Sequence, residues 1–345
     1  MNSVPSPYGL RLSVIVPSYN CAESLGCCLD ALLECSQIFP DEVIVVDDAS
    51  TDRSVEIASR LGVKLVTSRT NAGPGATRNL GAAHASGDIL VFVDADVAVA
   101  PDALGRLAQH FSRDPDCTAV IGSYDRAPKA RNFISEYRNL LHFYVHHHAP
   151  EQVSHFWTGL GAIRISAFNT VGGFNETEFG RVLEDVELGY RLRDAGYRIH
   201  LDRAVQGKHL KRWSFGLMVR TDLFLRAIPW MHLILARKEM PRDFSLGWGQ
   251  RASVAMSWLS SLALLAALAE PLAIAVMLLA LGAFVMVNLS FFRFLRARCG
   301  WALVLIALPL HWLYHFNSGV GFLLGVIFFM WPGLRTHFRL GALSL

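Results

Sequence analysis

The stretch Asp88-Ile89-Leu90-Val91-Phe92-Val93-Asp94-Ala95-Asp96-Val97 decides the fold. Its apolar run at 89–93 lies between acidic residues, which predicts a strand buried on both faces. The strand ends in an Asp-Ala-Asp motif. Two carboxylates one residue apart can present oxygens to one divalent cation, and Mg²⁺ and Mn²⁺ prefer oxygen ligands. Taken alone, the motif is equally well explained as a solvated acidic turn.

The residues before this stretch alternate between short β-branched runs and helical patterns. The expected strands are 12–16, 42–48, 63–67 and 88–94, and the expected helices are 22–33, 50–60, 76–85 and 101–111. This alternation predicts an α/β fold with a mainly parallel, doubly wound sheet. Its strands end in polar residues at 17–20, 47–48 and 94–96, so these residues share the sheet edge where ligands bind. No GxGxxG motif follows the first strand, which disfavours a dehydrogenase.

The second half of this region contains another acidic pair. Glu184-Asp185 begins an amphipathic helix that ends at Gly196, and 197–201 is expected to be a short strand. A carboxylate at this place could act as a general base. Favourable charge at a helix N-terminus explains the pair equally well. A further helix is expected at 131–148, and residues 213–248 mix aromatic, apolar and basic side chains as interfacial helices do; a soluble amphipathic helix is the alternative.

Composition separates a polar part of the chain from an apolar tail. The 345 residues include 32 Lys+Arg and 29 Asp+Glu, so the net charge of +3 gives no reason to expect nucleic-acid binding. Hydrophobic residues make up 52% of the chain. From Ala252 onward the only acidic residue is Glu270, and the basic residues are Arg293, Arg296, Arg298, Arg335 and Arg339. A soluble-looking domain followed by a membrane region is therefore expected.

Three apolar runs in the tail are long enough to span a bilayer, at 252–269, 271–292 and 301–331. A polar group in the third run, from His311 to Ser318, is expected to be buried in protein or to face a lumen. Basic residues precede the first run and separate the second from the third, which places both segments on the cytoplasmic side. Three spans are expected, although Arg335 and Arg339 leave a re-entrant hairpin or a fourth span open. The predicted parts are a cytoplasmic domain at 1–210, juxtamembrane helices at 211–251 and a membrane region at 252–345.

Six blocks, in order, resemble family 2 glycosyltransferases of the GT-A fold. The blocks are VIVPSYN (14–20), VIVVDDASTD (43–52), NAGPGATRNLG (71–81), DILVFVDADV (88–97), GGFNE (172–176) and LEDVELGYRLRDAGYRI (183–199). They cover about residues 11–210.

The resemblance implies a role for each matching residue. Asp185 matches the catalytic base, and Glu184 shapes its site. Asp96 matches the direct metal ligand, Asp94 lies nearer the ribose or behind the metal, and His209 is a further candidate ligand. The residues implied to bind the nucleotide sugar are Pro17, Tyr19, Asn20, Glu23, Asp48, Arg78, Asp94, Ala95 and Asp96.

The resemblance also implies an activity. This activity is the transfer of a hexosyl group from a nucleotide sugar to a membrane lipid or lipid-linked acceptor, with inversion at the anomeric carbon. It depends on Mn²⁺ or Mg²⁺. A UDP-sugar is the favoured donor, because UDP-sugars are common donors in the family. The implied location is an integral membrane protein of the bacterial inner membrane. A processive polysaccharide synthase is the alternative enzyme, but Lys211-Arg212-Trp213 lacks the Gln of a QxxRW motif. A non-catalytic membrane scaffold that binds nucleotide sugars is the alternative outside enzymes.

Three further expectations concern residues between 142 and 212. His142, His146, His147 and His148 lack an HExxH pattern, so a zinc site is disfavoured. Trp157 and Arg164 are expected, from their position alone, to line the acceptor site. Either Lys211 or Arg212 is expected to neutralise the leaving diphosphate.

Overall fold

A computed structural model describes residues 9–35, 40–177, 179, 181–240, 244–331 and 333. The chain divides into two compact units. The first comprises 1–131 and 146–212, and the second comprises 132–145 and 213–345. Each unit has a hydrophobic core of its own.

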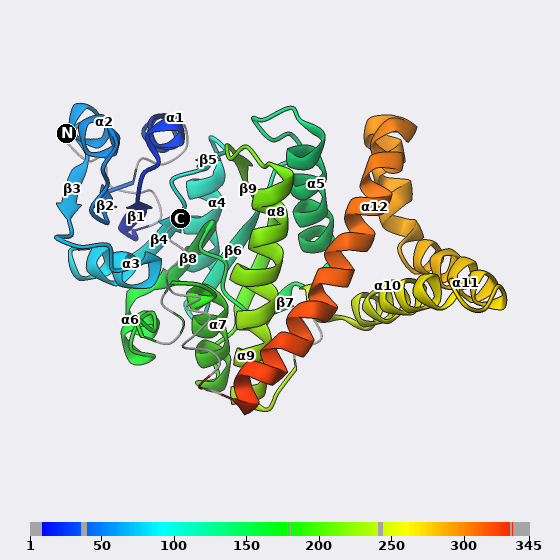
Figure 1. The fold of residues 1–345 in the computed structure, drawn as a ribbon. Coiled ribbons are helices and arrows are strands. Elements are labelled where there is room, and N and C mark those ends of the chain that lie inside the picture. The colour runs from blue at the N-terminus through cyan, green and yellow to red at the C-terminus, as the bar shows by residue number, and fades with distance from the viewer. Residues whose placement is uncertain are drawn as a thin grey trace. The chain divides into compact units, whose positions relative to one another are not determined.

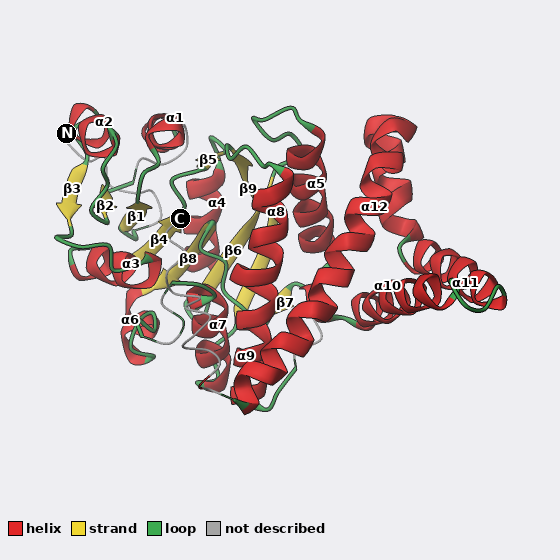
Figure 2. Ribbon diagram, viewed as in Figure 1, coloured by secondary structure: helices red, strands yellow, loops and turns green. Residues whose placement is uncertain are grey.

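The first unit is built on a mixed sheet (Figures 1 and 2). Within the described residues the strand order is β3-β2-β1-β4-β8-β6-β9-β5, and β7 pairs with β9. The strands β3, β2, β1 and β4 are parallel, as expected, whereas β8 is antiparallel to both of its neighbours. The strand bounds are β1 Leu12–Ser18, β2 Glu42–Asp47, β3 Lys64–Thr67, β4 Ile89–Val93, β5 Val97–Val99, β6 Ala119–Tyr124, β7 Gln152–Val153, β8 Leu160–Arg164 and β9 Ile199–His209.

Helices cover both faces of this sheet, which explains why β4 is apolar throughout and why Val14, Ile15 and Val16 of β1 are fully buried. One face packs with the apolar residues of α1 Ala22–Leu33 and α4 Ala103–Arg113. On the other face, α3 Pro74–Ala83 lies so close that a Cβ on Gly81 would be 2.5 Å from Ile15 Cγ2. The remaining helices are α2 Ser54–Arg60, α6 Ile165–Thr170 and α7 Glu184–Asp194.

Two elements differ from the sequence prediction. Helix α2 begins at Ser54 rather than at 50–52, because the Asp52 carboxylate accepts hydrogen bonds from Ser54 N and Ala22 N and holds this segment in a turn. Strand β9 extends to His209 rather than ending at Leu201. Pairing with β6, β5 and β7 extends it through polar residues that show no strand pattern of their own.

The second unit is helical and joins segments far apart in the sequence. Its helices are most of α5 Phe133–His148, then α8 Phe215–Arg220, the π-helix η1 Thr221–Ala227, α9 Ile228–Arg237, the 3₁₀ turn η2 Phe244–Leu246, α10 Trp248–Ala266, α11 Leu272–Val287 and α12 Leu289–Met330. The expected turn at Glu270-Pro271 joins α10 to α11. Helix α11 ends at Val287, because Asn288 leaves the helical region with φ −99° and ψ 12°. Gly300, with φ 74°, interrupts α12 near Trp301, where the third apolar run begins.

In the described part of the chain, α12 is the one helix long and apolar enough to cross a membrane by length and composition. Helix α11 is apolar but has only 16 residues. The three spans expected from the sequence stay a prediction. Arg335 and Arg339, which left the topology open, lie outside the described residues.

The polar group expected in the third apolar run is buried in protein. His311 lies between Tyr137 and Asn288: its Nδ1 is 3.0 Å from the Tyr137 hydroxyl, and its Nε2 is 3.0 Å from Asn288 Oδ1. The Asn288 amide then donates to Ser253 Oγ at 2.8 Å. These hydrogen bonds satisfy side chains from α5, α10 and α12, so the network fixes which helices pack together.

Glycine allows α12 to approach η1 closely. A Cβ on Gly321 would lie 2.3 Å from Ala227 Cβ, so Gly321→Ala is expected to destabilise the protein by about 1–3 kcal/mol through overpacking. The thermal unfolding midpoint of the full chain in detergent measures this effect. Gly282 in α11 is the matched control, because a Cβ there meets nothing within 4 Å. Gly282→Ala should leave the midpoint unchanged or raise it; equal midpoints for the two variants would contradict the packing argument.

Candidate active site

The Asp-Ala-Asp motif forms the turn between β4 and β5, at the carboxyl end of the parallel strands. Asp94 O accepts a hydrogen bond from Val97 N at 2.9 Å, and Asp96 O accepts one from Leu210 N at 2.8 Å. The two carboxylate side chains are 33% and 28% exposed, whereas Ala95 is buried. The motif thus presents two accessible carboxylates on a fixed backbone.

Arg78 joins this motif to the second acidic pair. Its guanidinium donates to Asp94 Oδ1 at 2.6 Å and to Glu184 Oε1 at 2.5 Å. The Arg78 and Glu184 side chains are only 5% and 8% exposed. Because α3 carries Arg78 and α7 begins at Glu184, one buried cation holds together elements about a hundred residues apart. The implied contact of Arg78 with the nucleotide stays a prediction.

Burial sets the protonation of the acidic pair. It raises the pKa of Glu184 to about 7; the Arg78 charge opposes this shift, and the Asp185 charge adds to it. Burial also raises the pKa of Asp185, again against the Arg78 charge. Burial opposes the charge of Arg78 too, but its carboxylate partners outweigh burial and raise its pKa. The single guanidinium of Arg78 cannot offset the burial of the three carboxylates of Asp94, Glu184 and Asp185. The Glu184-Asp185 pair is therefore poised to hold a proton.

His209 faces the second aspartate of the motif. Val97 pairs with His209 across β5 and β9, which brings His209 Nε2 to 3.7 Å from Asp96 Oδ2. The imidazole stacks on Tyr124 at 4.3 Å between ring centroids, and Trp157 packs edge-on against Tyr124 at 5.0 Å. Burial opposes ionisation of Asp96, but its interactions with His209 and the Lys211 charge lower its pKa. The sequence did not indicate Tyr124, although its place at the end of β6 could have drawn attention to it.

The residues of the first two loops lie at the same sheet edge. Asp48 accepts hydrogen bonds from Ala72 N and Gly73 N, both at 2.8 Å, so its carboxylate fixes the loop before α3. Asn20, with φ 48°, accepts from Thr51 N at 2.8 Å and ties the first loop to the second. Pro17 and Tyr19 are half-buried and Glu23 is exposed. Their roles toward a nucleotide stay predictions.

The adjacent Asp47 was not singled out in the sequence. It is 2% exposed, and its Oδ2 accepts from Ser50 N. Its Oδ1 has no hydrogen-bond partner within the described ranges.

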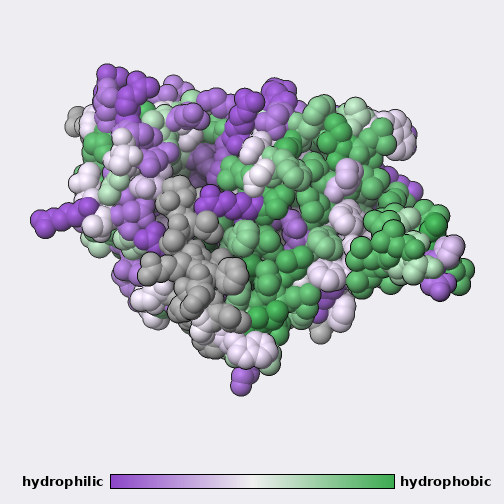
Figure 3. All heavy atoms as spheres, in the orientation of Figure 1, coloured by the Kyte–Doolittle hydropathy of each residue, from purple (hydrophilic) through white to green (hydrophobic). Residues whose placement is uncertain are grey.

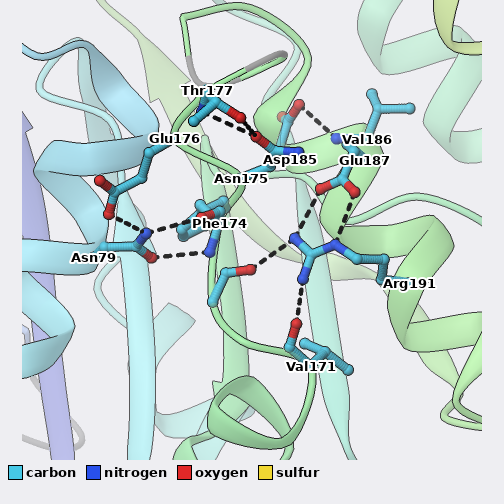
Figure 4. Close-up of polar contacts among 11 residues, drawn as sticks. Asn79, Val171, Phe174, Asn175, Glu176, Thr177, Asp185, Val186, Glu187 and Arg191 are labelled. Atoms are coloured by element: carbon cyan, nitrogen blue, oxygen red, sulfur yellow. Dashed lines mark hydrogen bonds and ion pairs between the residues drawn. The ribbon is translucent and has the colours of Figure 1, made fainter.

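The GGFNE turn is held from two sides (Figure 4). Asn79 of α3 donates to Phe174 O at 2.9 Å and to Glu176 Oε1 at 2.7 Å, and it accepts from Phe174 N. Arg191 of α7 binds both Glu187 oxygens at 2.7 Å, and it also donates to Val171 O and to Gly173 O. Neither residue was assigned a role from the sequence. Together they position the turn beside Asp185, whose Oδ1 accepts from Val186 N.

Arg191→Lys tests this positioning. An ammonium cannot reproduce the forked contacts with one carboxylate and two carbonyls, so we expect a loss of about 1–3 kcal/mol in stability and a fall in kcat of tenfold or more. Thermal unfolding and steady-state kinetics measure the two effects. Arg193→Lys on the same helix is the control, since its ion pair with Asp194 is partly exposed. Similar losses in both variants would contradict the positioning role.

The structure contradicts one expectation about the acceptor site. In the β4–β8 pairing, Arg164 lies opposite Ile89 at the start of β4, while Leu160 lies opposite Val93 at its end. The Arg164 guanidinium donates to the carbonyls of Phe111, Asp114 and Cys117. Arg164 is therefore a structural residue at the sheet edge away from the acidic motif. Trp157 does lie beside the His209–Tyr124 stack, and its contact with an acceptor stays a prediction.

Comparisons with known proteins show that this chain is similar to glycosyltransferases. The model of glycosyl transferase family 2 matches residues 13–172. The O-antigen chain rhamnosyltransferase RfbN of Salmonella typhimurium is 28% identical over 239 residues, which are 64% of this chain and 74% of that protein. The dolichol-phosphate mannosyltransferase of Pyrococcus furiosus is 26% identical over 229 residues, 63% of this chain and 60% of that protein.

A solved structure shows the same fold. The mannosyltransferase PcManGT from Pyrobaculum calidifontis, in complex with GDP-Man and Mn²⁺, has a TM-score of 0.56 and 20% sequence identity. The match covers 96% of this chain and 90% of that one. The expected GT-A-like fold is thus confirmed. Residues 13–172 thus match the family 2 glycosyltransferase model, and the chain is a glycosyltransferase by its similarity to several named enzymes of that kind.

Proposed function

We propose that this protein is an inverting, metal-dependent glycosyltransferase that moves a sugar from a nucleotide diphosphate to a membrane lipid or lipid-linked acceptor. One observation carries the proposal: Arg78 bonds Asp94 of the acidic motif and Glu184 of the second acidic pair. A candidate site for the diphosphate and a candidate base are thereby parts of one buried ionic cluster. A module that only binds nucleotide sugars needs no base.

The residues around Asp96 fit a divalent cation. Asp96 supplies carboxylate oxygen and His209 supplies imidazole nitrogen, and Mn²⁺ accepts both ligand types. Within the described residues, no cluster of three or more His, Cys, Asp or Glu side chains could hold a metal by itself. This matches a cation whose coordination is completed by substrate phosphate oxygens. Asp94 stands behind Asp96, since one of its oxygens is bonded to Arg78. When bound, the cation stabilises the negative charge of the leaving diphosphate.

Asp185 is the proposed base, and Glu184 holds it in place. Asp185 takes the proton of an acceptor hydroxyl, whose oxygen bonds to the anomeric carbon as the bond to the diphosphate breaks on the opposite face. A single displacement of this kind inverts the anomeric centre. The nucleotide lies along the polar sheet edge, with Pro17, Tyr19, Asn20, Glu23, Asp48, Ala95 and Arg78 as the proposed binding residues.

The donor nucleotide is proposed to be UDP. That choice follows the donor that is common in the family and rests on no residue of this chain. The structure of PcManGT, by contrast, contains a GDP-sugar, GDP-Man. Lys211 or Arg212 neutralises the leaving diphosphate.

The proposed acceptor follows from the C-terminal helices and from the relatives. Exposed apolar side chains gather on the α10–α11 hairpin (Figure 3), including Leu268 at 88% and Leu272 at 80% exposure. Contiguous apolar surface of this kind suits a lipid environment. The names of RfbN and of the dolichol-phosphate enzyme refer to O-antigen and to a lipid phosphate. The proposed organisation is a cytoplasmic domain at 1–210, interfacial helices at 211–251 and a membrane region at 252–345 in a bacterial inner membrane.

The test uses membranes that contain the full chain, incubated with labelled nucleotide sugars and Mn²⁺ or Mg²⁺. Label in the organic extract is expected with one donor only, and Asp185→Asn is expected to abolish it. Label that persists in Asp185→Asn would indicate a phosphate acceptor, which needs no base, and would overturn the role of Asp185. Tight nucleotide binding without transfer from any donor would overturn the enzymatic proposal in favour of a scaffold.

A further inference from the structure

A cavity in the second unit is not used by the proposed reaction. It has a volume of about 480 Å³, within the range of small-molecule sites. Its walls come mainly from η1, α9, α10 and α12 and are mostly apolar, with Trp230, Trp258 and Phe322 among them. Two arginines, Arg226 and Arg251, also line it. An elongated ligand with an apolar body and an anionic group would match such a lining.

The packing of the helices shows which residues lie at each end of the cavity. Gly321 faces Ala227 and Gly325 faces Met231, so α12 runs parallel to η1 and α9. Trp258 faces Gly319, and Trp312 donates to Ser260, so α10 runs antiparallel to α12. The residues that precede Trp258 in α10 therefore lie toward the C-terminal end of α9. Arg251 lies at that end of the cavity, and Asp222 lies at the other.

The π-helical segment η1 carries Asp222 and Arg226 into the cavity lining. Such segments often occur at functional sites, because the wider turn alters where side chains point. The Arg226 guanidinium forms no hydrogen bond or ion pair with any residue in the described ranges, and it is half-buried. A cation beside apolar walls with no protein partner favours an anionic ligand.

The remaining charges of the lining do not oppose an anion. Asp222 bonds Arg138 at 2.6 Å, and the two side chains are 3% and 8% exposed, so its charge is neutralised inside the unit. Arg251 is oriented by Leu246 O, 2.9 Å from its Nε, and by the Trp248 ring. Asp222, Arg226 and Arg251, together with Arg138, give this part of the unit a net positive charge.

We propose that this cavity binds a lipid phosphate with a single hydrocarbon chain, with the chain against the tryptophans and Phe322 and the phosphate at Arg226. The volume suits one chain rather than the paired chains of a bilayer phospholipid. Guanidinium groups bind phosphate through paired hydrogen bonds, which neutral walls alone could not supply. This site is distinct from the acidic cluster around Arg78, and the proposal concerns binding rather than transfer.

The test measures binding of tritiated farnesyl phosphate to the full chain in phosphatidylcholine nanodiscs by scintillation proximity. We expect saturable binding that unlabelled farnesyl phosphate displaces, with farnesol at least tenfold weaker and inorganic phosphate ineffective. Displacement by inorganic phosphate alone would show a plain anion site. Equal displacement by phosphatidylglycerol would show a site for bilayer lipid. Either result would overturn the proposal.

Variants locate the site. Arg226→Gln is expected to weaken binding about tenfold or more by removing a charged hydrogen bond. Ala255→Phe, which adds a ring to the lining, is expected to reduce binding without changing charge. Arg298→Gln is the matched control, since it removes an exposed charge of the same unit outside the cavity. Loss of binding in the control, or retention of binding in both cavity variants, would overturn the assignment. Asp96→Ala should bind normally even where transfer fails, which separates this proposal from the proposed function.

Discussion

Replacing Asp96 by alanine is expected to lower kcat/KM for the nucleotide sugar by about 10³-fold, because it removes the carboxylate that we propose binds the cation at the leaving diphosphate. The loss should come with a weaker response to Mn²⁺, so that more metal is needed for half-maximal rate. Steady-state transfer measured across a Mn²⁺ titration gives both quantities. The substitution leaves the backbone of the turn able to form, since the Asp96 carbonyl and not its side chain bonds Leu210.

The control for this change is Asp102→Ala. Asp102 precedes α4 and forms a partly exposed ion pair with Arg106, so its loss should change the rate less than twofold. If Asp96→Ala retained a rate within tenfold of the parent at every Mn²⁺ concentration, the metal role of Asp96 would be wrong. In that case His209 and Asp96 would form a structural contact in the core of the site.

Replacing Arg78 by methionine is expected to have the largest effect on stability. It leaves Glu184 and Asp94 beside each other without their shared cation, and breaking a buried pair in this way costs about 3–5 kcal/mol. We expect the thermal unfolding midpoint to fall by about 10 °C. Adding Glu184→Met to Arg78→Met should recover part of the loss, since the uncompensated buried charge is then removed.

Arg106→Met provides the comparison for Arg78→Met. Both variants remove an arginine that is bonded to an aspartate, but Arg106 is 43% exposed and its pair contributes at most about 1 kcal/mol. A midpoint for Arg78→Met no lower than that of Arg106→Met would show that the cluster does not hold the two acidic segments together. The double variant separates loss of a bridge from simple misfolding, because only loss of the bridge predicts partial recovery.

Much of the first unit could be predicted from local patterns. Helix 22–33 was predicted with the observed bounds. The acidic residues that end β2 and follow β4 were also expected there, because fully buried parallel strands are continuous apolar runs. Local sequence patterns did not predict structure that depends on pairing with neighbouring strands. Strand β9 continues through Asp202 and Lys208 because three other strands bond to it, and a polar stretch shows none of this in advance.

The sequence by itself determined the resemblance to family 2 glycosyltransferases, the parallel half of the sheet and the two acidic pairs. Each of these depends on residues close together in the chain. Only the tertiary structure decided that Arg78 bridges Asp94 and Glu184, that His209 faces Asp96, and that Arg164 lies at the other edge of the sheet. The physical reason is that these contacts depend on strand register and on helix docking between distant segments. A shift of one residue in a strand would turn each side chain to the other face.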